Sequence, residues 1–210
     1  MPTPYDIIKS IYGKLSTPVK VKQAEKIHIT PIQLTRIVQD AQTRKAAIAE
    51  AERAYFPFRV KMQQMYLNTT DNLHIKACMD RRKDLTLLRD WYFGGIETPD
   101  KKTTELFNKT WFSNFLSHSL DALFYGYTLI QLDDMVNNEF KKLSVVKRWN
   151  VSPDRFEVCQ FPYMPNGDKF LEEPLKDWYV YIDTTNDIGV SPCGYGLLYD
   201  LSIAEIFLRN

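Results

Sequence analysis

The chain has few cysteines and few glycines, and their placement excludes several kinds of site. Cys78, Cys159 and Cys193 lie far apart and form no C-x-x-C motif. This spacing predicts neither a zinc ribbon nor a disulfide framework, and it fits a reducing compartment. No G-x-x-x-x-G-K loop occurs among the eight glycines, and Gly194-x-Gly196 lacks the third glycine of a dinucleotide fingerprint. We therefore expect no metal and no cofactor.

Long apolar runs are also missing. The longest such stretch extends from Ala122 to Ile130, whereas a membrane helix needs about 20 apolar residues. We therefore expect no membrane partner. With 210 residues, of which 44% are hydrophobic and 25% charged, the composition is that of a globular protein that can bury a core.

The chain as a whole has almost no net charge, but its first 150 residues are basic and its last 60 are acidic. The net charge is +1, yet residues 1–150 carry 23 basic and 16 acidic residues, and residues 151–210 carry four basic and ten acidic ones. A near-neutral chain does not favour tight non-specific binding to DNA, which requires a net basic surface. The uneven division either favours head-to-tail contacts between copies or is ordinary variation between segments.

The N-terminal part of the sequence predicts an arm followed by helices. Residues 1–29 contain three prolines and several lysines and are expected to be an extended arm. Thr30-Pro31-Ile32-Gln33 is typical of a capped helix start, and the apolar spacing continues this helix to about Arg53. A second helix is predicted from Pro57 to about Asn68. Residues 69–72 should end it and cap a third helix from Leu73 to about Lys83.

The remainder predicts strands and helices in alternation. Leu85 to Phe93 alternates as a strand does, and Thr103 to Tyr125 has the spacing of one or two core helices ended by Gly126. Tyr127–Asp133 and 139–146 are expected to form a hairpin. Further strands are predicted at Arg155–Phe161 and Trp178–Ile182, and a final helix should begin at Gly194 or Gly196 and continue to Asn210.

Short turns between consecutive strands indicate an α+β fold, with helices packed on a mixed or antiparallel sheet. We expect residues 30–210 to form this domain. Because the final helix shows no stop signal, we also expect the domain to be truncated at its C-terminal end.

Two basic clusters are the candidate contact sites. They comprise Arg81, Arg82 and Lys83 in the first, and Lys141, Lys142, Lys147 and Arg148 in the second. Three interpretations remain open for them: solvated surface, contacts to the acidic segment of a neighbouring subunit, or contacts to DNA phosphate. No aromatic residues alternate with these cations as in single-strand binders.

A magnesium-dependent nuclease is an alternative, with Asp133 and Glu139 as metal ligands and Lys141 as the cation. The short turn between them would place these side chains at a solvent-facing hairpin tip, and Glu-x-Lys is a weak motif. A second alternative is a non-viral oligomeric interaction module that assembles through its aromatic surface.

Three stretches, in this order and at these distances, resemble the N-terminal half of the portal proteins of tailed bacteriophages, in the Mu-like branch. They are LHIKACMDRRKDLTLL at 73–88, LDALFYGYTLIQL at 120–132 and RWNVSPDRFEV at 148–158, and GYGLLYDLSIAEIFLRN at 194–210 adds to them. The resemblance covers roughly residues 30–210 and rests on the order of the stretches, since none is specific alone.

The resemblance implies a structural protein without catalytic residues, so not an enzyme. Such a protein forms a ring, usually a dodecamer, at the capsid vertex of the virion, and double-stranded DNA is packaged and ejected through it. Its implied partners are further copies of itself, the packaging terminase, head–tail adaptor proteins and capsid proteins, first met in the host cytoplasm during assembly. The matching segment is the N-terminal part of the portal wing.

Overall fold

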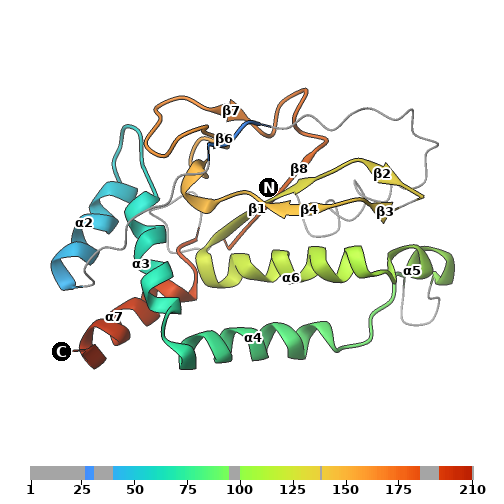
Figure 1. Ribbon diagram of the computed structural model, residues 1–210, viewed down its shortest axis with the longest axis horizontal. Coiled ribbons are helices and arrows are strands. Elements are labelled where there is room, and N and C mark those ends of the chain that lie inside the picture. Colours follow the sequence, from blue (N-terminus) through green and yellow to red (C-terminus); the bar gives the residue numbers. More distant parts are fainter. Residues whose placement is uncertain (1–26, 31–39, 95–99, 138, 185–193, 210) are drawn as a thin grey trace.

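Helices α6 and α4 lie as two successive layers on one side of a small antiparallel sheet in the computed structural model (Figure 1). The structure describes residues 27–30, 40–94, 100–137, 139–184 and 194–209, and the statements below concern these residues. A second small sheet lies on the far side of the first, so the order across the molecule is α4, α6, sheet, sheet. The predicted α+β class is confirmed, with antiparallel pairing at every described ladder.

Three helices make up the first part of the fold. They are α2 (Ala41–Ala51), α3 (Val60–Thr70) and α4 (Leu73–Leu87). The predicted cap before α4 is confirmed, because the Asn72 side chain accepts hydrogen bonds from the amides of His74 and Ile75 at 3.0 and 3.4 Å.

The described helix α2 begins later than predicted. Its N-cap is Asp40, whose Oδ1 accepts from the Thr43 amide, so a single helix running from Thr30 is wrong. Thr30 itself is not in a helix, and its amide donates to the Gln160 carbonyl at 3.3 Å. The rest of the predicted helix start, residues 31–39, lies outside the described residues.

The strand predicted for Leu85–Phe93 is also wrong. Helix α4 continues through Leu87, and the Thr86 hydroxyl donates to the Arg82 carbonyl inside it. The alternating pattern has two different origins in the two halves of this segment. Leu85 and Leu88 are exposed on the helix, whereas Trp91 and Phe93 turn back into the core.

The core forms between α6 (Thr110–Tyr125) and the strand β1 (Tyr127–Leu132) that follows it directly. The region predicted as one or two helices is two, with α5 at Lys101–Phe107. Gly126 ends α6 at φ +89°, as predicted, and a Cβ there would lie 2.2 Å from the Gly194 carbonyl oxygen. Only glycine therefore fits the turn from α6 into β1.

Strand β1 is the centre of the first sheet. It pairs with β4 (Leu143–Val145) and β8 (Tyr179–Asp183), and Ile130 lies opposite Val145 on one side and Val180 on the other. At the far end of this hairpin, β2 (Met135–Val136) pairs with β3 (Glu139–Phe140). Helix α7 (Leu197–Arg209) begins as predicted, just after Gly196.

The second sheet is built from two-residue strands. It consists of β5 (Val151–Ser152), β6 (Glu157–Val158) and β7 (Asp168–Lys169), preceded by the 3₁₀ turn η1 (Arg148–Asn150). The strand predicted for Arg155–Phe161 is thus correct only at β6, because Phe156 takes φ +55° and turns the chain into β6. We call residues 151–178 the outer lobe.

Residues Ile27–Thr30 pack onto the outer lobe. The Ile27 amide donates to the Tyr179 hydroxyl at 3.1 Å, and Ile27 and Ile29 contact the apolar cluster around Val158 and Phe170. Residues 27–30 therefore lie beside the acidic segment of the chain.

Candidate functional site: helix α4 and its attachment to the core

Helix α4 buries very little of its surface. Met79 is its one buried residue, while Leu73, Leu85 and the capping Leu88 are 81%, 57% and 79% exposed. A helix on a globular core normally turns a broad apolar stripe inward. Helix α4 instead exposes these three leucines, while Ile75 and Met79 pack on the core.

The predicted cluster on α4 is divided by the helical rotation. Arg81 and Arg82 are exposed, whereas Lys83 turns toward α6. Its Nζ lies 2.8 Å from Asp121 Oδ1, and the two side chains are 18% and 19% exposed. An ion pair so shielded from water resists screening by salt better than a surface pair.

The same carboxylate holds Arg148 from the second predicted cluster. Arg148 Nη2 lies 3.2 Å from Asp121 Oδ2, and its guanidinium carbon lies 4.0 Å from the centre of the Tyr125 ring. Arg148 Nε also donates to the Tyr127 carbonyl, and the Tyr127 hydroxyl donates to the Arg148 carbonyl at 2.8 Å. Asp121 therefore joins α4, α6 and η1, and we call this group the Asp121 junction.

Two titratable side chains near the junction respond to its burial and its charges. Burial lowers the pKa of His118, and the Asp121 carboxylate opposes this effect. Burial likewise raises the pKa of the Tyr125 phenol, with the Arg148 guanidinium opposing it. Both residues thus favour their neutral forms beside a charged triad.

The other predicted cations lie apart from the junction. Lys141 and Lys142 are exposed in the turn between β3 and β4, and Lys147 lies 5.3 Å from the centre of the Trp149 ring. The second predicted cluster is therefore not one patch. Lys141 and Lys142 lie together on the surface, Lys147 lies apart from them beside Trp149, and Arg148 faces inward. Contact of any of these residues with a subunit or with DNA stays a prediction.

The residues of the nuclease alternative do not converge. The Glu139 side chain is 51% exposed and pairs with Lys109 at 3.0 Å, and Asp133 Oδ1 accepts from the neighbouring Asp134 amide. Within the described ranges, no three His, Cys, Asp or Glu side chains are grouped as a metal site requires. In the same part of the chain, no helix combines the length and the apolar character needed to cross a membrane.

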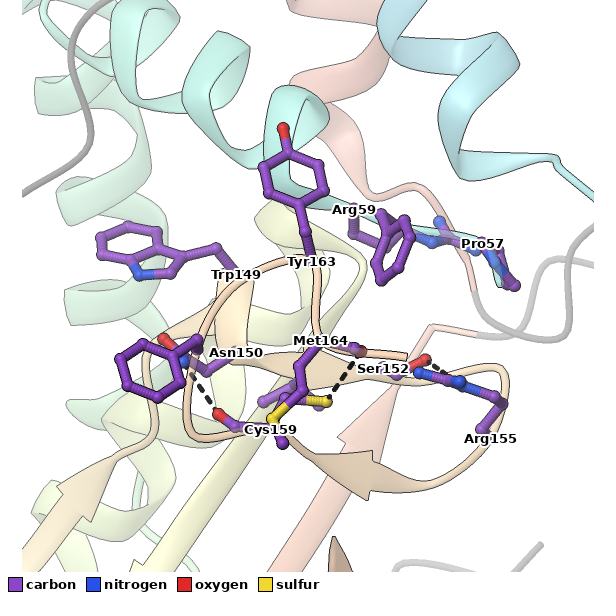
Figure 2. Close-up of a pocket in the computed structure, with 12 residues that line it drawn as sticks. Pro57, Arg59, Trp149, Asn150, Ser152, Arg155, Cys159, Tyr163 and Met164 are labelled. Atoms are coloured by element: carbon purple, nitrogen blue, oxygen red, sulfur yellow. Dashed lines mark hydrogen bonds between the residues drawn. The ribbon is translucent and has the colours of Figure 1, made fainter. Parts of the chain in front are cut away.

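A small aromatic pocket was missed from the sequence (Figure 2). Residues 57–59, 149–152 and the loop 161–164 line it, and its interior of about 10 Å³ holds roughly one water molecule. Asn150 donates through Nδ2 to the carbonyls of Cys159 and Gln160, and burial raises the pKa of the Cys159 thiol. The pocket is too small for a substrate, and its thiol is held in the unreactive protonated form.

A ladder of arginine and tyrosine side chains was also missed. Arg44 lies 4.4 Å from the centre of the Tyr199 ring, Tyr199 stacks on Tyr195 at 4.8 Å, and Arg59 lies 5.1 Å from the Tyr195 ring. The Tyr195 hydroxyl also donates to Glu52 Oε1 at 2.6 Å. The ladder fastens α7 to α2 and α3, and the i, i+4 spacing of the two tyrosines was its one sequence signal.

A second pair at this spacing lies on α4, where His74 Nε2 and Cys78 Sγ are 3.9 Å apart on the exposed face. Two side chains alone do not form a metal site.

The described residues form a helical layer that packs on small sheets and is joined to them by shielded ion pairs. Residues 63–210 match the family model described as the portal protein of Mu bacteriophage. The chain belongs to this family of phage structural proteins. No curated protein matches the chain, and no solved structure matches it.

Proposed function

We propose that the chain forms part of the wing of a phage portal ring, with twelve copies at one capsid vertex. The family match over residues 63–210 is the observation that carries the proposal. The α+β layering and the paired charges around Asp121 support it, because both suit a rigid structural part.

In the proposed role, double-stranded DNA passes through the ring during packaging and ejection. The terminase would engage the ring on one side, and head–tail adaptor and capsid proteins would engage it elsewhere. Assembly would take place in the host cytoplasm before the ring becomes part of the virion. The near-neutral charge of +1 supports a conduit function, since DNA must slide past without tight phosphate contacts.

The division of charge along the chain supports a closed ring. Each contact in a ring is heterologous, so one surface of a copy meets a different surface of the next. A basic surface before residue 150 and an acidic segment after it provide two such surfaces of opposite charge.

The proposal is tested in virus particles. Cryo-electron microscopy of particles carrying a tag on this chain should place the tag at a single vertex, and particles lacking the chain should contain no genome. Electron microscopy of the purified protein should show rings with a central hole. Tags at all vertices, or filled heads without the chain, would overturn the proposed function.

A further inference from the structure

The outer face of α4 carries a regular stripe of exposed side chains. His74, Cys78, Arg81, Leu85 and Leu88 follow one another at alternating steps of four and three residues. At 3.6 residues per turn this spacing places them in one row on the side away from Met79. Each of the five is exposed.

The charge on this face is mostly positive. Arg81 lies within the row and Arg82 borders it beside Leu85, whereas the helical rotation places Asp84, and further round Asp80, on the opposite flank. The α4 stripe therefore combines two exposed leucines with Arg81, and it has a basic residue on one border and an acidic residue on the other. Exposed leucines bordered by charge are typical of a surface that another protein covers.

A second exposed apolar surface lies where the outer lobe meets the segment before α3. Phe161, Tyr163 and Met164 line the small pocket of Figure 2 and are 42%, 45% and 38% exposed. Phe56, which precedes the pocket residue Pro57, is 47% exposed. We call these four residues the aromatic rim. Phe56 and Tyr163 have φ of +50° and +66°, a conformation that costs a bulky residue about 1 kcal/mol or more.

The aromatic rim is tied together by ring contacts. Phe58 meets Tyr163 edge to face at 5.4 Å, and the Arg155 guanidinium carbon lies 5.3 Å from the Phe56 ring. Aromatic rings with an arginine among them make up the composition of protein–protein hot spots. The lobe around them is acidic, because residues 151–178 carry six acidic and three basic side chains.

The two surfaces lie on opposite sides of the molecule. Helix α4 forms the lowest layer in Figure 1, and β6 and β7 of the outer lobe lie at the top, with α6 and the first sheet between them. One copy therefore cannot close the two surfaces on each other. A second copy can, and repeating the same contact yields a ring or a filament.

We propose that the α4 stripe of one copy packs against the aromatic rim and acidic lobe of the next copy. This inference rests on the proposed function and names the surfaces by which neighbouring copies would meet. Charge favours this occupant, since the two leucines of the stripe, with Arg81 before them in the row and Arg82 beside them, would face an acidic lobe that carries exposed aromatic side chains. DNA is a poorer match for α4, because exposed leucines offer nothing to phosphate.

Cross-linking between native and introduced thiols tests the contact. One variant keeps Cys78 and carries Cys193→Ser. Its partner carries Cys78→Ser, Cys193→Ser and Tyr163→Cys. A short bismaleimide should join the two variants into a dimer when they are mixed, and should join neither variant to itself. Phe161→Cys replaces Tyr163→Cys if circular dichroism shows that the latter fails to fold.

Two controls sharpen the result. A cysteine at Asp84, on the opposite flank of the same helix and in a Cys78→Ser background, should give at least about tenfold less dimer. Arg81→Glu should lower the cross-linked yield by a similar factor, because a tenfold loss corresponds to about 1.4 kcal/mol and a like charge at an interface costs at least that much. The buried Cys159, whose pKa is raised, is expected to react slowly in every variant.

The outcomes separate the two proposals. Dimer formed only by the mixed pair supports this interface. The interface is overturned if the Asp84→Cys variant gives as much dimer as the variant with Cys78, or if the mixed pair gives no dimer at about 0.5 mM protein. It is also overturned if the protein binds DNA through Arg81 and makes no contact between copies. The position of the chain in virus particles is a separate measurement, so a chain found at one vertex without this cross-link would overturn the interface alone.

Discussion

Replacing Asp121 by Asn should loosen helix α4 from the core before it disturbs the rest of the fold. The substitution keeps the size of the side chain and removes the charge that Lys83 and Arg148 share at 2.8 and 3.2 Å. Both cations would remain in place with side chains only 18% and 15% exposed. They would therefore be left without their counter-charge in a poorly hydrated position.

The size of the effect follows from this partial burial. Removing one partner of a fully buried pair costs about 3–5 kcal/mol, and an exposed pair contributes about 0–1 kcal/mol. Asp121 is 19% exposed and holds two cations, so we expect a loss of about 2 kcal/mol in the free energy of unfolding. For a domain of this size, that loss lowers the melting temperature by about 4–8 °C.

Two measurements check this expectation. Urea unfolding gives the free-energy change, and amide hydrogen exchange should show the protection of α4 falling more than that of β1. Asp84→Asn is the matched control, because it makes the same chemical change at an exposed carboxylate on the same helix. If Asp121→Asn destabilises no more than Asp84→Asn, the junction is not what attaches α4. A Lys83→Met and Asp121→Asn double-mutant cycle with no coupling would lead to the same conclusion.

Three further predictions address the turn after α6, the aromatic rim and the nuclease alternative. Gly126→Ala should lower the free energy of unfolding by at least about 2 kcal/mol in a thermal unfolding experiment, since a Cβ at φ +89° would lie 2.2 Å from the Gly194 carbonyl oxygen. A loss under about 0.5 kcal/mol, the size of a neutral surface substitution, would contradict the turn geometry. Burial and then Glu50 raise the pKa of Tyr163 from 10.0 to about 12, so the folded protein holds this proton more tightly and stability should fall as pH rises from about 10 through 12. Tyr163→Phe should remove that part of the fall and the phenolate absorbance that develops near pH 12 in an alkaline titration, and an unchanged titration would show that the phenol is not shielded. Neither the parent chain nor the Glu139→Ala variant should cleave DNA in the presence of Mg²⁺. The substitution should lower the free energy of unfolding by under about 1 kcal/mol, because the ion pair between Glu139 and Lys109 is exposed. If the parent chain cleaves DNA and the variant does not, the nuclease interpretation is correct.

The helices and strands with strong local signals were predictable. Helix α6 has a continuous apolar spacing and ends at Gly126. Strand β1 begins at the next residue, so its start follows from the end of the helix. The start of α4 was predicted from the capping segment 69–72, because a cap acts within a few residues, and Asn72 is the residue that caps the helix. In each case the decisive interactions lie close together in the sequence.

Elements held by distant contacts were not predictable in this way. Strands β5, β6 and β7 have two residues each and exist because they pair with one another around a turn, so the longer strand predicted from Arg155 to Phe161 was wrong. The end of α4 was missed for a related reason. Alternation in residues 85–93 does not reveal that its apolar side chains face solvent in one half and the core in the other.

The candidate site shows the same division. Arg81, Arg82 and Lys83 are adjacent in the sequence, and only the 100° step per residue decides that Lys83 faces α6. The carboxylate that receives it belongs to Asp121, 38 residues away, and Arg148 comes from 27 residues beyond that. Charge clusters read along a sequence therefore predict basic surfaces but not which cation turns inward.

Helix α4 reverses the usual arrangement of an amphipathic helix, and this reversal bears on assembly. Its inner attachment depends on Ile75, Met79 and the Lys83–Asp121 pair, while Leu73, Leu85 and Leu88 face outward. An ion pair of this kind contributes little net stability after desolvation, but it is directional and fixes the rotation of the helix. Outward leucines stabilise nothing in a single copy and expose apolar surface, so they become favourable only when another surface covers them. Burying the exposed leucines of α4 against a neighbouring copy would therefore add a favourable free energy that one copy alone does not gain.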